Sequence, residues 1–193
     1  MLTETIRSRD DLVRAIRSGR RPELFLFWGH KPLPNGIIGK SCLSQWWPAR
    51  FCVEGVTYPT AEHFMMAEKA RLFGDESTRA RILTTRHPKT AKELGREVRH
   101  FKQDVWHKER FHIVVRGNLA KFEQNRDLGD YLLSTGDKVL VEASPYDDIW
   151  GIGLAADDQR AKNPAQWRGL NLLGFALMEV RQILRTGGSD SQT

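Results

Sequence analysis

The sequence predicts a single, helix-rich α+β domain with only a few short strands. Most of its 193 residues fall into segments whose apolar spacing is typical of amphipathic or buried helices. Short β-prone runs occur near residues 24–28, 51–58 and 138–144. These strands do not alternate regularly with helices, so a doubly wound parallel sheet is not expected.

The N-terminal part predicts a helix, a strand and a hairpin. Residues 8–18 mix charged and apolar side chains and are followed by Gly19, a pattern typical of a short amphipathic helix with a glycine after its C-terminus. The apolar run at residues 24–28 predicts a buried strand. Glu54 and Gly55 separate two short β-prone runs and predict the turn of a hairpin.

The remaining segments are mostly helical. We expect helices at 60–73, 75–84, 88–98, 103–124 and 127–136, a strand at 138–144, a loop at 145–169 and a closing helix at 170–185. Loops as long as the one predicted here are usually functional or disordered.

The predicted organisation is an N-terminal helical extension at residues 1–22, one main domain at 23–185 and a disordered tail at 186–193. The tail, TGGSDSQT, lacks apolar anchors. Neither an apolar run long enough to cross a bilayer nor an N-terminal signal segment is apparent. We therefore expect a soluble, cytoplasmic protein without a membrane partner.

Composition limits the classes of ligand that the protein could bind but does not identify one. The formal charge of +6 favours an anionic ligand, but acidic residues are interspersed among the basic ones, so a solvated surface explains most of this excess. A nucleic-acid-binding function would rest on charge alone. Cys42 and Cys52 form no CxxC pair, and the six histidines lack the spacing of a metal site. We expect no metal and no cofactor.

The stretch TAEHFMMAEKARLF, residues 60–73, carries two opposite charges on an otherwise apolar face. Positions seven apart in a helix point in nearly the same direction, which places Glu62 and Lys69 on one stripe. A structural interpretation is available, because Glu62 would suit the first turn of a helix and Lys69 could extend its ammonium to water. A catalytic pair is the alternative.

Two further segments combine charge with indole rings. Trp106 and Arg110 lie four apart in the predicted long helix, where a core tryptophan with a stacked arginine is one interpretation. Asp147, Trp150 and Gly151 occur in the loop after the last strand. The Gly-x-Gly there is too short for a dinucleotide-binding fingerprint, and no helix follows it directly.

Taken together, these segments give the chain a family resemblance. The order YPTAEHF, LGR, Trp106, KFEQN, LVEAS, D-x-x-WGIG and N-x-x-G-x-x-LM-x-x-R resembles the NADAR (YbiA-like) family, over about residues 27–184. The resemblance implies cleavage of N-glycosidic bonds, either in ribosylamino-pyrimidine 5′-phosphates of early riboflavin synthesis or in ADP-ribosylated guanine. Two segments depart from relatives: residues 43–46 read Leu-Ser-Gln-Trp, and the insertion at 154–168 is long.

Carried over residue by residue, the resemblance implies that the site contains or adjoins six residues: Glu62, Lys69, Trp106, Asp147, Trp150 and Asn171. The candidate catalytic residues are Glu62, Lys69 and Asp147, and the candidate substrate-binding residues are Trp28, Arg96, Trp106, Trp150, Gly151 and Asn171.

These residue types suit the reaction. A carboxylate of Glu62 or Asp147 would stabilise an oxocarbenium-like sugar or activate water. The indoles of Trp106 and Trp150 would stack on the heterocycle, and Arg96 or another basic group would bind the phosphate. Lys69 would act electrostatically or, if neutral, form a Schiff base with the opened sugar.

A different class of function remains open. A non-catalytic module that binds ADP-ribose or a related nucleotide would use the same tryptophans and basic groups without turnover. Such a module has little need for Glu62 and Lys69 on one helical stripe. In both cases the expected partner is a phosphorylated ribosyl or ADP-ribosyl small molecule, and the guanine substrate could also belong to a nucleic acid.

Overall fold

The computed structural model describes residues 6–187 and has a predominantly helical α+β fold, as predicted. It divides into two compact units. Unit 1 comprises Met1–Leu43 and Asp130–Thr193, and unit 2 comprises Ser44–Gly129. Within residues 6–187, no helix is long and apolar enough to cross a membrane.

Unit 1 contains a pair of strands, helices at both chain ends and several 3-10 turns. Its elements are α1 (Arg9–Arg17), β1 (Leu24–Phe27), η1 (Pro34–Gly36), η2 (Lys40–Leu43), β4 (Val139–Glu142), η3 (Gln159–Lys162), η4 (Pro164–Gln166) and α7 (Leu172–Gly187). Helix α6 (Arg126–Ser134) contains the boundary with unit 2.

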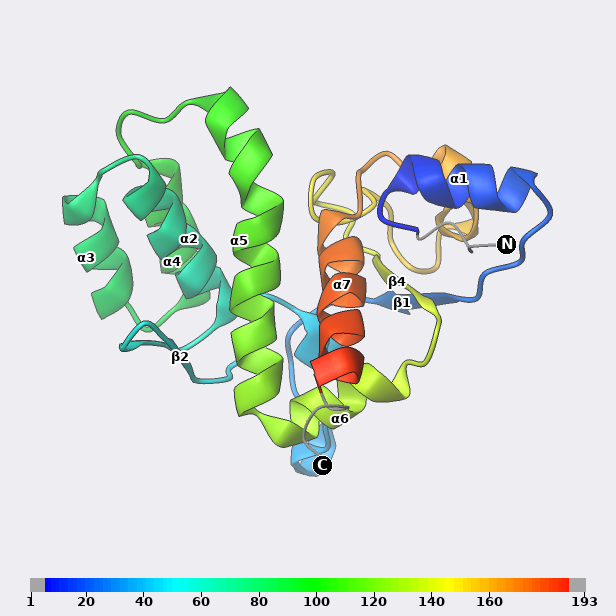
Figure 1. Cartoon of the computed structure of the whole chain (residues 1–193), viewed down its shortest axis with the longest axis horizontal. Coiled ribbons are helices and arrows are strands. Elements are labelled where there is room, and N and C mark those ends of the chain that lie inside the picture. The colour runs from blue at the N-terminus through cyan, green and yellow to red at the C-terminus, as the bar shows by residue number, and fades with distance from the viewer. Residues whose placement is uncertain (1–5, 188–193) are drawn as a thin grey trace. The chain divides into compact units, whose positions relative to one another are not determined.

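The two strands of unit 1 are parallel, although they lie far apart in the sequence. Leu24 pairs with Val139 and Phe27 pairs with Glu142. Helix α7 packs on β4, as Figure 1 shows. Because the strands are parallel, both end at the same edge, and the residues that follow them are brought together there.

The N-terminal helix and the long insertion pack against each other in unit 1. Ser8 caps α1 by accepting a hydrogen bond from Asp11 N, and Gly19 follows the helix with φ of 94°. Helix α1 contacts η4, and the Arg9 guanidinium donates to the Trp167 carbonyl at 3.1 Å. The insertion is therefore ordered, with Trp167 almost fully buried.

Unit 2 contains a hairpin followed by helices. Its elements are β2 (Phe51–Val53), β3 (Val56–Tyr58), α2 (Ala61–Leu72), α3 (Glu76–Thr84), α4 (Pro88–Arg96) and α5 (Gln103–Gln124). The predicted hairpin is confirmed: β2 and β3 are antiparallel, and Glu54 and Gly55 both have positive φ, as a tight type I′ turn requires.

Helix α2 lies at the centre of unit 2 and contacts α3, α4 and α5 (Figure 1). It is buried on nearly every side, which explains why its sequence is apolar well beyond one stripe. Phe64 of α2 packs edge to face on Tyr58 and at a tilt on Phe51, both in the hairpin, with ring centroids 5.0 and 6.0 Å apart. Helix α2 therefore fixes the positions of both Glu62 and Lys69 within unit 2.

The predicted helices and strands all occur, with ends shifted by a few residues. Helix α5 covers 103–124 as predicted, whereas α7 runs to Gly187, past the predicted start of the tail at residue 186. The rest of the tail and residues 1–5 lie outside the described residues. The proposed division at residues 22 and 185 stays a prediction.

Candidate functional site

The amine of Lys69 lies among groups contributed by three helices and a loop of unit 2. Its Nζ donates to the Gly95 carbonyl at 2.7 Å. The same atom lies 4.4 Å from the ring centroid of Phe101 and 5.6 Å from that of Trp106. The amine is therefore held by one directional hydrogen bond and otherwise faces aromatic rings.

These surroundings lower the pKa of Lys69 from its ordinary value of 10.5. Burial is the main cause, because it disfavours the charged ammonium, and the positive charge of Arg96 adds to the shift. A close carboxylate of Glu62 would act in the opposite direction by favouring the ammonium, but the net shift is downward, so the effect of burial is the larger one.

The close packing of α4 on α2 places the carbonyl that receives the Lys69 hydrogen bond. A Cβ at Gly95 would overlap the side chain of Met66 on α2. Only glycine lets the last turn of α4 approach this closely. The Gly95 carbonyl and the next residue, Arg96, are thereby brought to Lys69.

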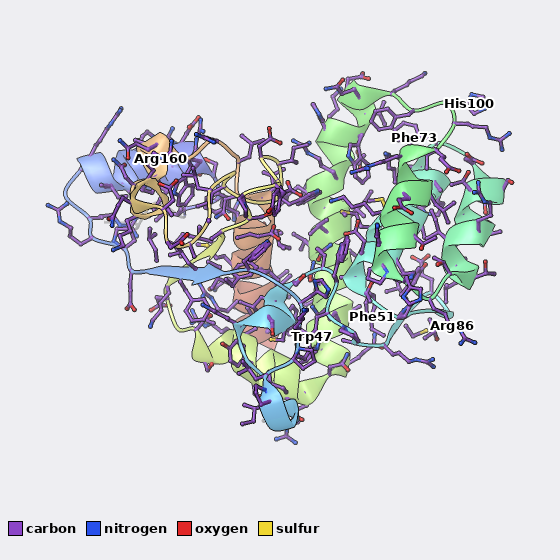
Figure 2. All side chains as sticks on the ribbon, turned by 180° about the vertical axis from the view of Figure 1, so that it is seen from behind. Trp47, Phe51, Phe73, Arg86, His100 and Arg160 are labelled. Atoms are coloured by element: carbon purple, nitrogen blue, oxygen red, sulfur yellow. The ribbon has the colours of Figure 1, made fainter. Side chains whose placement is uncertain are left out.

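An aromatic wall covers the same end of unit 2. Phe73 at the end of α2 and Phe101 in the loop before α5 pack edge to face, with centroids 5.2 Å apart. Figure 2 shows Phe73 and His100 at this end of the unit. Trp106 in the first turn of α5 is half-buried. Phe101 and Trp106 face the Lys69 amine and contribute to the burial that lowers its pKa.

Glu62 lies in the first turn of α2 and is 3% exposed. Thr60 caps the helix by accepting from His63 N, and Glu62 N donates to the Gln45 carbonyl at 3.0 Å. Gln45 belongs to the segment that departs from the family pattern, so this segment anchors the backbone of a candidate catalytic residue.

A second buried carboxylate on α2, that of Glu68, has a structural role. Arg71 binds it with two nitrogens, and Arg116 of α5 also forms an ion pair with it. Glu68 is 3% exposed, like Glu62. The pair of arginines neutralises Glu68, which therefore serves as an internal comparison for Glu62.

In unit 1 an aromatic pair forms at the C-terminal edge of the strands. Trp28 directly follows β1, and Tyr146 lies four residues after β4. Their rings are tilted at 48° with centroids 6.3 Å apart. Trp28 is 53% exposed and Tyr146 is 88% exposed. Such exposed rings offer a surface for a flat ligand.

The loop at residues 147–153 is held by its own backbone and by Asp147. The carboxylate Oδ1 of Asp147 accepts from Ile149 N at 2.9 Å and from Trp150 N at 2.7 Å. A Cβ at Gly151 would lie 2.9 Å from the carbonyl oxygens of Asp147 and Glu142. Asp147 and Gly151 thus fix the path of the loop that presents Trp150.

Asn171 joins this loop to β4 from the start of α7. Its side-chain oxygen accepts from Glu142 N at 2.9 Å, and its side-chain nitrogen donates to the Leu140 carbonyl at 2.9 Å. Its own N–H donates to the Gly151 carbonyl. The residue is fully buried with φ of 57°, a conformation that asparagine tolerates better than most residues.

The structure thus places the candidate residues in two groups. Unit 2 contains Glu62, Lys69, Arg96 and Trp106, of which the last three are neighbours. Unit 1 contains Trp28, Asp147, Trp150, Gly151 and Asn171, of which the last four build one loop. Phe101 and Tyr146, which face Lys69 and Trp28, were not predicted from the sequence. Each is an aromatic residue within a polar, charged segment, HFKQD and SPYDD, and this pattern could have indicated them.

Comparisons with known proteins agree with this arrangement of motifs. A NADAR domain model matches residues 26–185. The N-glycosidase R617 of Acanthamoeba polyphaga mimivirus is 45% identical over 149 residues, which cover 75% of this chain and 88% of that protein. The N-glycosidase YbiA of Escherichia coli (strain K12) is 33% identical over 138 residues, which cover 72% and 76%.

Solved structures give the same result. The NMR structure of the Escherichia coli protein YbiA matches with a TM-score of 0.69 and 26% identity, covering 94% of this chain and 97% of that one. The resemblance found in the sequence is confirmed by the matched domain, by these relatives and by the fold. The chain belongs to the NADAR domain family.

Proposed function

We propose that this protein is an N-glycosidase whose reaction depends on Lys69 and Glu62 of unit 2. The observation that carries the proposal is the environment of the Lys69 amine, which donates to a helix-end carbonyl, faces aromatic rings and has a lowered pKa. Relatives over most of the chain are named N-glycosidases, which supports the same reaction class.

An N-glycosidic bond breaks as positive charge develops on the sugar and the base departs. A carboxylate stabilises the oxocarbenium-like sugar or removes a proton from water. Glu62 is the carboxylate that we assign to this task, because it lies buried in the first turn of α2, on the same helical stripe as Lys69. Asp147 remains the second candidate, with an oxygen bound to its own loop.

Lys69 has a nucleophilic route in addition to an electrostatic one. A ribosylamine opens to an imine between the base nitrogen and C1, and a neutral lysine amine adds to C1. Transfer of a proton to the base nitrogen releases the base amine and leaves a lysine Schiff base. Water then adds to C1, and cleavage of the bond between C1 and Nζ releases the sugar as its aldehyde and regenerates the free lysine amine. A lowered pKa of Lys69 favours the first addition, because only the neutral amine carries a lone pair.

For the substrate we propose a ribosylamino-pyrimidine 5′-phosphate or an ADP-ribosylated guanine. Arg96 is exposed and close to Lys69, so a phosphate bound there would lie near the amine. Trp106 offers an indole face beside it. In unit 1, the exposed Trp28 and the loop residue Trp150 are proposed to contact the heterocycle, with Gly151 and Asn171 shaping the loop.

Incubation with each substrate tests the proposal. Chromatography should detect free base from the pyrimidine substrate or restored guanine from the ADP-ribosylated one. Glu62→Gln should lower turnover by about 10²- to 10⁴-fold, the usual contribution of an acid–base group. Glu68→Gln is the matched control, with similar burial on the same helix; it should reduce stability and leave turnover of the folded fraction within a few fold.

The outcomes separate an enzyme from a binding module. Tight binding of both substrates without any release of base would support a non-catalytic nucleotide-binding protein. Borohydride added during turnover should trap the sugar on Lys69, and mass spectrometry of the peptide would locate the adduct. Turnover without an adduct would favour the electrostatic role of Lys69.

A further inference from the structure

Unit 1 contains a cavity of about 770 Å³ that none of the candidate site residues lines. It lies where β1 and β4 begin, since Pro22 and Val139 line it, whereas Trp28 and Tyr146 follow the opposite ends of these strands. Phe175 and Met178 of α7 contribute apolar surface. A volume of this size is typical of small-molecule sites.

The polar part of the cavity is dominated by arginine. Its five arginines face only two acidic residues, Asp137 and Glu179: the arginines are Arg7, Arg20, Arg21, Arg181 and Arg185. This gives the lining an excess of three positive charges. The basic residues come from the segment before α1, the segment before β1 and helix α7. Distant parts of the chain therefore contribute positive charges to the same cavity.

One of the arginines is rigidly placed. Arg181 is 4% exposed, and its guanidinium donates to the Thr135 hydroxyl at 2.7 Å and to the Lys138 carbonyl at 2.9 Å. These bonds use two of its five N–H donors. Two fixed bonds also hold the planar group in one orientation, which lowers the entropy cost of binding a ligand.

The positive charges are crowded. Burial, together with the neighbouring Arg185, lowers the pKa of Arg181 to about 10. Arg185 pairs with Asp137 at 2.8 Å and also donates to the Gly136 carbonyl, so Asp137 offsets only part of the repulsion. An anion in the cavity would relieve this repulsion and would gain charge-assisted hydrogen bonds.

We propose that this cavity is a second ligand site, which binds a phosphate-bearing small molecule through its arginines and the molecule's apolar part through Phe175 and Met178. Phosphate fits better than a simple carboxylate, because several guanidinium groups converge and each binds a tetrahedral trianion or dianion in pairs of hydrogen bonds. The site is distinct from the proposed reaction, which depends on residues of unit 2 and on the opposite strand ends.

The methionines allow a site-resolved test. Met178 lines the cavity, whereas Met65 and Met66 lie in α2 of unit 2. With methyl-labelled methionine, phenyl phosphate should shift the Met178 signal saturably in an NMR titration, because its ring would contact the methyl. Inorganic phosphate should bind more weakly. Met178→Leu assigns the signal.

Charge variants decide whether the arginines are responsible. Arg7→Gln combined with Arg21→Gln removes two exposed members of the lining and should weaken phenyl phosphate binding roughly tenfold or more, since hydrogen bonds to charged groups are individually strong. Arg17→Gln combined with Arg86→Gln makes the same change of net charge elsewhere and should leave the affinity within twofold. Lys69→Met should leave the Met178 titration unchanged.

Three results would overturn the proposal. They are a Met178 signal that does not shift at millimolar phenyl phosphate, an equal loss of affinity in both double variants, or saturable shifts at Met65 and Met66 without one at Met178. Loss of glycosidase activity has no bearing on these signals, so failure of the proposed function and failure of the second site are distinguishable.

Discussion

The surroundings of Lys69 in unit 2 and the loop at residues 147–153 in unit 1 use polar side chains in opposite ways. Lys69 makes one hydrogen bond to a carbonyl and otherwise faces aromatic rings. Asp147 and Asn171, by contrast, bind backbone groups with their side-chain atoms. The first region lowers the pKa of a buried amine, whereas the second uses side-chain hydrogen bonds to hold the backbone of a loop in place.

This difference separates two kinds of candidate site residue. Burial without full compensation costs stability but changes reactivity, as the lowered pKa of Lys69 shows. Hydrogen bonds to otherwise unsatisfied backbone groups raise stability and act on function through geometry. Substitutions in the first region should therefore reduce turnover, and those in the second should reduce stability first.

The largest effect is expected for Lys69→Met, which keeps the apolar stem. Turnover should fall by at least about 10²-fold, because the nucleophile or the stabilising charge is lost. Steady-state kinetics with the substrate that the parent protein cleaves would measure it. Turnover within a few fold of the parent would return Lys69 to a structural role.

Lys121 offers a matched control within unit 2. It is fully buried in α5, and its Nζ donates to the Ser44 carbonyl at 2.9 Å. Lys121→Met should lower the free energy of unfolding by about 1–3 kcal/mol, because the buried carbonyl loses a donor. Its turnover per folded molecule should change little. Lys69→Met would then reduce turnover, whereas Lys121→Met would reduce stability.

A smaller effect, this time on stability, is expected for Asn171→Ala. Glu142 N–H and the Leu140 carbonyl both lose their side-chain partner, which costs about 2–4 kcal/mol for two buried groups. The positive φ at this position adds strain for alanine. Urea unfolding would measure the loss. An unchanged midpoint would show that the loop and β4 do not depend on this amide.

Local structure was predictable because its signals are local. Ser8 and Gly19 delimit α1, and Glu54 with Gly55 forms the hairpin turn, as the sequence indicates. The division into two units was not predictable, because one boundary follows a buried 3-10 turn and the other lies inside α6. Neither place has the composition of a linker.

The contacts of the candidate site residues could not be predicted from the sequence. Lys69 meets a carbonyl 26 positions away, which depends on how α4 packs on α2. Periodicity places Glu68 in the same helix as Glu62 but does not reveal that Arg71 and Arg116 bind Glu68. The use of the Asn171 amide by β4 likewise follows from tertiary structure, since its partners are 29 and 31 positions away.

A next, smaller effect concerns the indoles of unit 1. Trp28→Ala removes a ring that is 53% exposed, so stability should change by only about 0.5 kcal/mol. Substrate affinity should fall roughly five- to 100-fold if the ring stacks on a base, since such stacking contributes about 1–3 kcal/mol. Isothermal titration with the catalytically inactive Lys69→Met background avoids turnover.

Trp150→Ala completes this comparison within the loop. The Trp150 carbonyl still accepts from Leu173 N in the variant, because the bond is formed by backbone. We expect weaker substrate binding with the fold largely retained. A cooperative loss of stability with unchanged affinity in the folded fraction would instead give Trp150 the same backbone-fixing role as Asn171.

The smallest effect is a pH dependence of stability that only the first region should show. Burial and Arg96 lower the pKa of Lys69 in the folded protein below its ordinary value of 10.5. Between the lowered value and 10.5, the unfolded chain binds more protons at this position than the folded one does. Stability therefore rises with pH across that window, and below it the cost of the buried ammonium is constant.

Lys69→Met lacks this titration. At neutral pH the variant loses the hydrogen bond to the Gly95 carbonyl but no longer buries a charge, so two opposing effects set its stability. The stability of the variant relative to the parent should fall as pH rises toward 10.5, by at most about 1.4 kcal/mol per pH unit for one proton. Urea midpoints of both proteins from pH 7 to pH 10 would measure this change. A relative stability of the variant that rises with pH would mean that the folded protein favours the ammonium, and the neutral-amine route would lose its basis.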